Sequence, residues 1–322
     1  MTRAPESGTD RAAIDRRRVQ ANFARAAGTY ASLSVVQREI ARRLFEHLDP
    51  VRIAPRRILD LGCGSGADLL ALHERYPGAA VLGADLSPAM LREAQRQQRS
   101  HSWLLPFLRR ARAPLLAADA AALPLSSASV GFIWSNLMLH WLSEPRSVFA
   151  EAHRLLETGG LLMFSTLGPD SLKELRAAFA TAYGGEGSEG SEGSEGRAHP
   201  DPHAHTHRFV DMHDLGDMLV ESGFADPVMN METLTLTYPS LSAALADLRA
   251  GGGCALRSRR RGLMGRREFE RFTAACAGSM QEGRLPITLE VIYGHAWRAE
   301  SRRAEDGRAI VRFVPPRTHG AE

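Results

Sequence analysis

The stretch Ile58-Leu59-Asp60-Leu61-Gly62-Cys63-Gly64-Ser65-Gly66 decides the fold. An apolar run that leads directly into three alternate glycines is typical of a buried strand followed by a tight loop. Because glycine has no Cβ, such a backbone can come very close to a ligand. The spacing is GxGxG, not the GxGxxG of dinucleotide-binding loops, so it does not indicate a pyrophosphate site. Asp60, near the end of the strand, suits a ligand with an amino or cationic group.

Three further polar residues, Asp85, Asp119 and Asn136, follow or end other predicted strands. Ligands bind at the carboxyl ends of strands in open α/β sheets. The Asp85 carboxylate can accept hydrogen bonds from both ribose hydroxyls, and Asp119 can accept one from an exocyclic amine such as that of adenine. Alone, either aspartate could simply cap a helix or a turn. In this order, and after the glycine loop, they predict a pocket for a nucleoside that carries an amino acid.

Apolar runs alternate with helical patterns, which predicts a parallel sheet with helices on both faces. We expect strands at 57–61, 80–85, 115–118, 130–135, 161–166, 228–238 and 286–297. We expect helices within 16–48 and at 68–76, 88–98, 147–156, 171–183, 212–222, 241–249 and 266–280. The last two strands would complete a seven-stranded, mostly parallel sheet with an edge hairpin.

Composition is that of an ordinary globular protein: 322 residues, 44% apolar, 24% charged, net charge +3. Extensive disorder is therefore excluded. Cys63, Cys254 and Cys276 give neither a disulfide framework nor a CxxC metal pattern, which suits a reducing compartment. Without a long apolar span or an apolar leader segment, we expect a cytoplasmic protein that does not bind membranes.

Two other features could suggest additional ligands. His199, His203, His205 and His207 lie with prolines next to a repeated Gly-Ser-Glu segment, which is a flexible loop by composition, so we assign no metal. The arginine-rich stretch 257–271 contains one aromatic residue, and we expect no nucleic acid partner.

The segment 60–66, with Asp85 and Asp119 downstream, resembles the class I S-adenosylmethionine-dependent methyltransferases. The resemblance implies a Rossmann-like fold and S-adenosyl-L-methionine as cofactor. It also implies that the three glycines border the methionine portion, that Asp85 binds the ribose diol, and that Asp119 and Ala120 flank the adenine. The implied cofactor-binding residues are Asp60, Gly62, Gly64, Gly66, Asp85, Leu86, Asp119, Ala120 and Asn136.

Further stretches resemble the malonyl-[acyl-carrier protein] O-methyltransferases of biotin synthesis. They are residues 22–27 with Tyr30, Gln37-Arg38, Ser135-Asn136-Leu137 with Trp141, 164–168 with Leu172 and Glu174-Leu175, 207–209 and 293–297. The chain departs from that pattern at His140, where members often carry glutamine, and in the Gly-Ser-Glu insertion. The resemblance implies methyl transfer to the free carboxylate of a malonyl thioester on acyl-carrier protein, or on coenzyme A.

Such a reaction needs no catalytic acid or base. A malonyl carboxylate is ionised at neutral pH, so positioning and exclusion of water suffice. Tyr30 is our candidate for a lid residue that contacts cofactor or substrate, although it could equally be an ordinary tyrosine of an amphipathic face. His295 is a candidate for the far end of the site, and a locally bonded strand histidine is the other interpretation.

Arg257, Arg259, Arg260 and Arg261 are candidates for docking the acidic carrier protein by electrostatic steering, the other interpretation being a solvated arginine-rich face. Two other functions remain open from the sequence, and a non-enzymatic nucleotide sensor is a more distant third. One is a small-molecule carboxyl methyltransferase of similar fold. The other follows from Tyr238-Pro239, which with residues 245–249 resembles a family of respiratory complex I assembly factors, including protein arginine hydroxylases.

These patterns divide the chain into six expected segments. They are a disordered tail (1–15), an N-terminal helical lid (16–50), the S-adenosylmethionine-binding core (51–183), a flexible loop (184–206), a C-terminal part that completes the sheet and adds a helical substrate-side insertion (207–300), and a tail (301–322).

Overall fold

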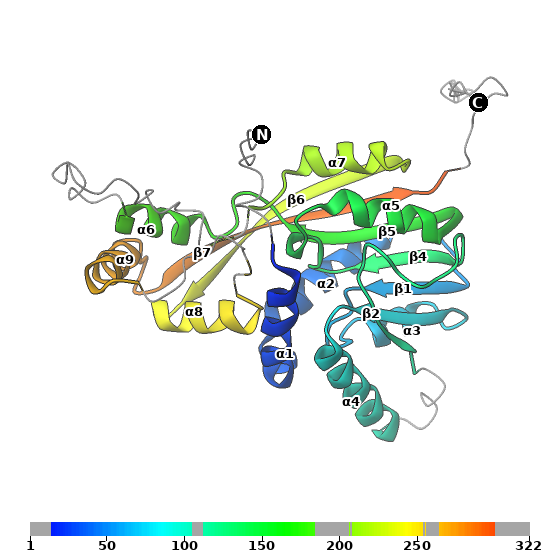
Figure 1. Cartoon of the computed structure of the whole chain (residues 1–322), viewed down its shortest axis with the longest axis horizontal. Coiled ribbons are helices and arrows are strands. Elements are labelled where there is room, and N and C mark those ends of the chain that lie inside the picture. Colours follow the sequence, from blue (N-terminus) through cyan, green and yellow to red (C-terminus); the bar gives the residue numbers. More distant parts are fainter. Residues whose placement is uncertain are drawn as a thin grey trace, which may run out of the picture.

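The computed structural model describes residues 14–104, 112–183, 206, 208–253, 255 and 264–299. The strands are β1 (Arg57–Leu61), β2 (Ala80–Asp85), β3 (Leu115–Ala117), β4 (Val130–Ser135), β5 (Leu156–Leu167), β6 (Ala225–Tyr238) and β7 (Leu285–Trp297). They form one sheet in the order β3-β2-β1-β4-β5-β7-β6 (Figure 1). The first five are parallel and β7 is antiparallel to both of its neighbours. The predicted seven-stranded, mostly parallel sheet is confirmed.

The helices are α1 (Arg16–Leu33), α2 (Val35–Leu48), α3 (Leu69–Arg75), α4 (Pro88–Leu104), α5 (Pro145–Leu155), α6 (Lys173–Tyr183), α7 (Met212–Glu221), α8 (Leu241–Ala250) and α9 (Arg266–Gly278). A short 3-10 turn, η3, spans Leu139–Trp141. The predicted helical region 16–48 is interrupted at Ser34, where the backbone leaves the helical conformation. The other helix and strand limits differ from the predicted ones by a few residues, most in α4 and β5, which are both longer.

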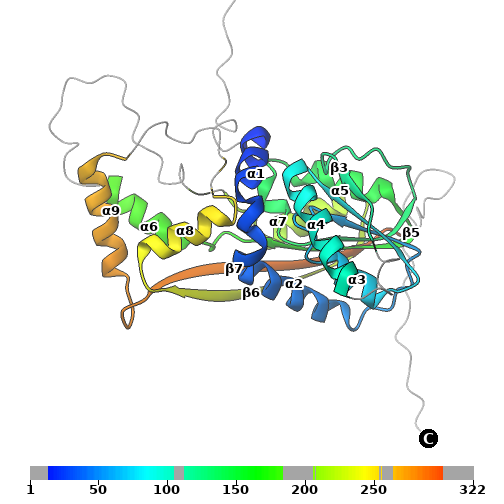
Figure 2. The same cartoon turned by 90° about the horizontal axis from the view of Figure 1, so that it is seen from below.

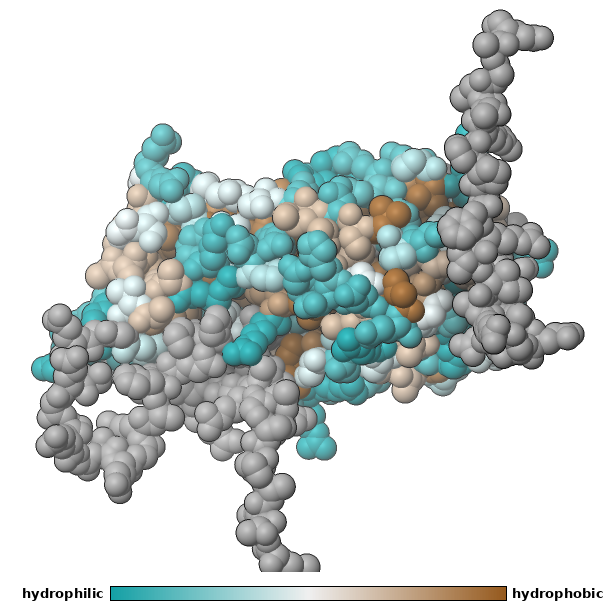
Figure 3. Space-filling view, turned by 90° about the horizontal axis from the view of Figure 1, so that it is seen from above, coloured by the Kyte–Doolittle hydropathy of each residue, from teal (hydrophilic) through white to brown (hydrophobic). Residues whose placement is uncertain are grey.

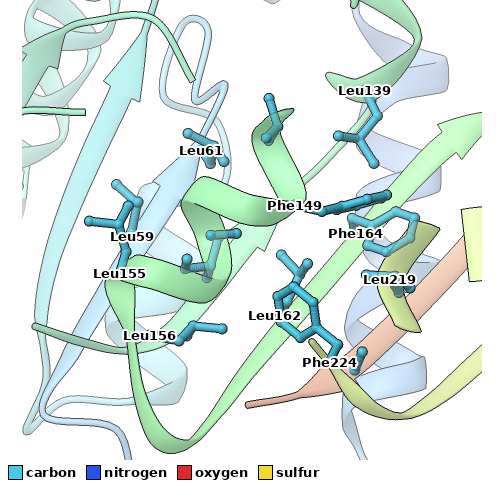
Figure 4. Packing of buried hydrophobic residues seen from close by; sticks show 14 of the residues in the cluster. Leu59, Leu61, Leu139, Phe149, Leu155, Leu156, Leu162, Phe164, Leu219 and Phe224 are labelled. Carbon is cyan, nitrogen blue, oxygen red and sulfur yellow. The ribbon is translucent and has the colours of Figure 1, made fainter. Parts of the chain in front are cut away.

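Side chains alternate along the strands and so supply two cores, one on each face of the sheet. Leu59 and Leu61 point to the face covered by α5 and α7, where Phe149 packs on Phe164 with ring centroids 5.6 Å apart (Figure 4). Ile58 points to the other face, which is covered by α2 and α3. Helices therefore lie on both faces, as the βαβ alternation requires.

The last two strands do not form a simple hairpin. β7 lies between β5 and β6, and the chain makes α8 and α9 before it returns along β7. Figures 1 and 2 show α6, α8 and α9 gathered at one end of these long strands. Their apolar faces share a separate core with the start of β7, in which Phe179 stacks on Phe272 at 4.4 Å. The prediction of a helical insertion beside the sheet agrees with this arrangement.

Among the described residues, no helix is both long and apolar enough to cross a membrane. On the face that Figure 3 shows, the described surface is largely hydrophilic, with hydrophobic residues scattered through it. Arg257, Arg259, Arg260 and Arg261, and the histidines from 199 to 207, lie outside the described residues.

The close approach of β5 and β7 generates a prediction for stability. Gly294 pairs with Phe164, and a Cβ added there would contact the Phe164 ring and lie 2.9 Å from Met229 Sδ. Gly294→Ala should therefore lower the free energy of unfolding by about 1–3 kcal/mol through overpacking. Chemical denaturation measures this. Gly278→Ala is the matched control, because a Cβ there meets no atom within 4 Å. Equal stability of both variants would contradict this account of the sheet.

Candidate functional site

Three cavities meet at the carboxyl ends of the parallel strands, beneath α1. The strand-end cavity holds about 830 Å³ of empty space, part of it open to solvent, and lies between α1 and the ends of β1, β2 and β3. The acidic cavity, of about 450 Å³, lies beside the glycine loop and takes its name from Asp60 and Asp68. The α8 cavity is the largest, at about 2140 Å³, and lies between α1, α2 and α8. Tyr30 lines all three.

Eight of the nine predicted cofactor residues line the strand-end or the acidic cavity. Asp85 connects the glycine loop to the next strand, because its carboxylate accepts hydrogen bonds from Gly64 N at 2.9 Å and from Ser87 N at 2.7 Å. Burial raises the pKa of the Asp85 carboxyl, while these backbone hydrogen bonds lower it. Asp119 accepts a hydrogen bond from Ala121 N at 3.0 Å and forms an ion pair with Arg16 of α1.

The exception is Gly66, which lines neither cavity, so its place beside the methionine portion stays a prediction. Its φ is +80°, and a Cβ there would lie 2.9 Å from Cβ of Ala94 in α4. Gly66 therefore allows α4 to pack closely against the loop, which is a structural requirement of the same motif. Gly62 and Gly64 also have positive φ values, and they do line both cavities.

The acidic cavity contains buried acceptors that lack donors. Asp60 is 2% exposed, and its Oδ2, like Gln37 Oε1, finds no hydrogen-bond partner among the described residues. Burial, then the negative charges of Asp68 and Asp85, raise the pKa of the Asp60 carboxyl well above its ordinary value. Arg38 supplies a cation at the same cavity, where its Nη1 donates to Ser34 Oγ at 3.1 Å.

Asp68 lies opposite, at the start of α3. Burial raises the pKa of its carboxyl to about 6, against the hydrogen bonds from Trp134 and Asn136 that lower it. The Trp134 indole Nε1 donates to Asp68 Oδ2 at 2.9 Å. Asp68, Gln37 and Arg38 line the acidic cavity but were not among the predicted site residues. The helical spacing from Tyr30 to Gln37 could have indicated the last two.

Tyr30 lies where the cavities meet, and its ring contacts Phe23 edge-on at 5.9 Å. Burial, then the negative charges of Asp85 and Asp68, raise the pKa of the Tyr30 hydroxyl above its usual range, so it remains protonated. The rest of α1 covers the strand-end cavity, where Gln20 Nε2 donates to Leu86 O at 3.0 Å.

The structure does not bring His295 to the site. It lies in β7, paired with Met163 and Val228, and lines none of the described cavities. Its pKa is lowered by burial and by the nearby His47. A local strand histidine, the other interpretation of the sequence, fits this position. No group of three metal-binding side chains occurs among the described residues.

Comparison with known proteins identifies the class of this domain. Residues 59–164 match the family described as methyltransferase domain. The fold resembles that of the YcgJ protein from Bacillus subtilis, with a TM-score of 0.54 at 14% identity, over 81% of this chain and 99% of that one. The protein is thus a class I, Rossmann-like methyltransferase, whose cofactor is S-adenosylmethionine.

Two relatives identify the family to which the chain belongs within this class. The chain is 46% identical over 305 residues to malonyl-[acyl-carrier protein] O-methyltransferase of Laribacter hongkongensis, covering 94% of this chain and 96% of that protein. It is 41% identical over 300 residues to the enzyme of the same name from Gallionella capsiferriformans, covering 93% and 96%. The chain belongs to the malonyl-[acyl-carrier protein] O-methyltransferase family.

The Asp68–Trp134 hydrogen bond predicts a titration in the ligand-free protein. Indole fluorescence should change with a midpoint near pH 6 as Asp68 ionises, and Asp68→Asn should remove that transition. Because the folded-state pKa is raised, the contribution of Asp68 to stability is present at low pH and is lost as pH rises from about 4 to about 6. A transition that persists in Asp68→Asn would assign it to another group.

Proposed function

We propose that this protein transfers the methyl group of S-adenosylmethionine to the free carboxylate of a malonyl thioester on acyl-carrier protein, as a step in biotin synthesis. The observation that carries the proposal is the sequence identity of 46% and 41% to two enzymes of that name, over more than nine tenths of this chain. The meeting of a nucleoside-sized cavity, an acidic cavity and a large third cavity at Tyr30 supports it. The comparisons do not favour the small-molecule or assembly-factor alternatives.

The residues present fit the cofactor. An α-ammonium group carries three N–H donors and a positive charge. The acidic cavity offers Asp60 Oδ2 and Gln37 Oε1, two buried acceptors that find no donor within the described part of the chain. Arg38 at the same cavity would pair with the methionine carboxylate. Asp85 would accept from the ribose hydroxyls, and Asp119 with Ala120 and Leu86 would border the adenine.

The protein's own contribution to the reaction is placement. When bound, the cofactor supplies a methyl group activated by its sulfonium charge. The acceptor carboxylate is already ionised at neutral pH, so no side chain needs to remove a proton. Tyr30, which stays protonated, cannot act as a base and would donate a hydrogen bond at the junction of the cavities. We assign α1 the role of a lid. Its Phe23 ring packs edge-on against Trp141 of η3, with ring centroids 5.0 Å apart, and this contact would exclude water.

Several finer points belong to the same proposal. Coenzyme A could replace the carrier protein, since both present a thioester on the same type of arm. The assignment of Arg257, Arg259, Arg260 and Arg261 to carrier docking stays a prediction from sequence. A cytoplasmic location is supported by the buried free thiols of Cys63 and Cys276, which suit a reducing compartment. The absence of a nucleic acid or membrane partner stays a prediction from sequence.

A methyl-transfer assay tests the proposal with malonyl-carrier protein, malonyl-coenzyme A and free malonate in parallel. We expect the carrier thioester to be methylated with the highest kcat/KM. With saturating cofactor, the rate should be nearly flat between about pH 6 and 8, because no group must lose a proton. Preference for malonate would favour a small-molecule enzyme. A steep rise near pH 7 would indicate an alcohol or amine acceptor instead.

The ribose assignment predicts the effect of Asp85→Ala. Cofactor binding should weaken by about 1.5–3 kcal/mol for each charge-assisted hydrogen bond lost. Release of the Gly64 and Ser87 amides would add to the effect. Calorimetry measures the dissociation constant, and Asp217→Ala, an exposed aspartate of α7, is the control. A folded Asp85→Ala protein with unchanged affinity would contradict the assignment.

A further inference from the structure

The α8 cavity poses an electrostatic problem for a malonyl substrate. Its described lining is predominantly apolar, from Ile40 and Leu137 at one side to Leu245 and Leu248 of α8 at the other. An ionised carboxylate placed in such surroundings without a partner is strongly destabilised. A cation must therefore meet it. The carboxylate is also the group that distinguishes a malonyl thioester from an uncharged acyl thioester.

Among the described residues that line this cavity, the permanently charged cations are Arg25 of α1 and Arg249 of α8. The acid in that lining, Asp247, already accepts a hydrogen bond from the Tyr238 hydroxyl at 2.5 Å. No acidic partner is recorded for either arginine within the described chain. Two guanidinium groups thus line a common space in which Asp247 is the one acid among the described lining residues.

Hydrogen bonds hold the two arginines at one junction of helices. Arg25 donates to Asn22 on the same helix, and Asn22 Nδ2 donates to Gly252 O at 2.8 Å. Gly252 N in turn donates to Arg249 O at 3.2 Å. Gly252 has a φ of +107°, and a Cβ there would lie 2.8 Å from the Trp141 ring, so glycine is required for α8 to approach this closely. The end of α8 therefore lies directly against α1.

We infer that Arg25 and Arg249 together bind the carboxylate of the acyl substrate, and that methylation itself releases the product from them. This rests on the proposed function. Carboxylate and guanidinium form charge-assisted hydrogen bonds, whereas the methyl ester has no charge to hold. The negative charge also declines as the oxygen attacks the methyl group, so the pair binds substrate more tightly than the transition state. Both arginines are exposed, which limits that ground-state attraction by solvent screening.

The experiment uses malonyl-pantetheine, which carries no phosphate and no protein surface, with the full-length chain. Arg25→Gln and Arg249→Gln should each raise KM about tenfold, with kcat unchanged or slightly higher. The inhibition constant of the product methyl ester should not change, because that ligand lacks the charge. Arg249→Lys should recover part of the loss. Arg52→Gln, an exposed arginine before β1 and away from these cavities, is the matched control.

A parallel rise in KM and in the inhibition constant of the ester would overturn the inference and assign the arginines a structural role. A rise in KM for malonyl-carrier protein alone would assign them to the arm phosphate or the carrier, and would also overturn it. If the wild-type chain methylates no malonyl thioester, the proposed function fails. Calorimetry of malonyl-pantetheine and of its ester, with S-adenosylhomocysteine present, then tests separately whether the arginine pair binds the carboxylate. Equal affinities of the protein for the two ligands would overturn the inference.

Discussion

Three carboxylates beside the glycine loop constrain the whole site. They are Asp60, Asp68 and Asp85. The last two lie close enough to Asp60 for their negative charges to raise the pKa of its carboxyl. Burial of like charges is costly unless a cation or donors compensate. The backbone compensates Asp85, through Gly64 and Ser87, and the Trp134 indole compensates Asp68. Asp60 keeps an oxygen that has no donor among the described residues, and this is where we propose that the cationic group of the cofactor binds.

The glycine loop makes this arrangement possible. It carries the chain from β1 past Asp85 with positive φ at Gly62, Gly64 and Gly66. Gly62 and Gly64 line the cavities, and Gly66 lets α4 pack against the loop. Binding and packing therefore depend on one short segment, and a side chain at any of the three positions would strain its left-handed backbone.

The helix α1 contacts two parts of the molecule that lie far apart in the sequence. It contacts the strand-end loops through Arg16 and Gln20, and it contacts the end of α8 through Asn22. Tyr30, at its far end, lines all three cavities. A change in the position of α1 would thus alter the cofactor side and the proposed substrate side together, which couples the two sites physically.

The sequence by itself determined the sheet and the class of ligand, and eight of the nine residues that it predicted for cofactor binding line the strand-end or the acidic cavity. Strand alternation, the GxGxG loop and polar residues at strand ends are local signals, because each follows from a few neighbouring residues. Gly66 shows the limit of such signals, since the motif does not say whether a glycine faces a ligand or a helix. Only the tertiary structure brought Gln37 and Arg38 to Asp60, Arg249 to Arg25, and left His295 in a distant strand. These juxtapositions depend on how α1, α2, α8 and β7 pack, and packing is decided by contacts between residues far apart in the chain.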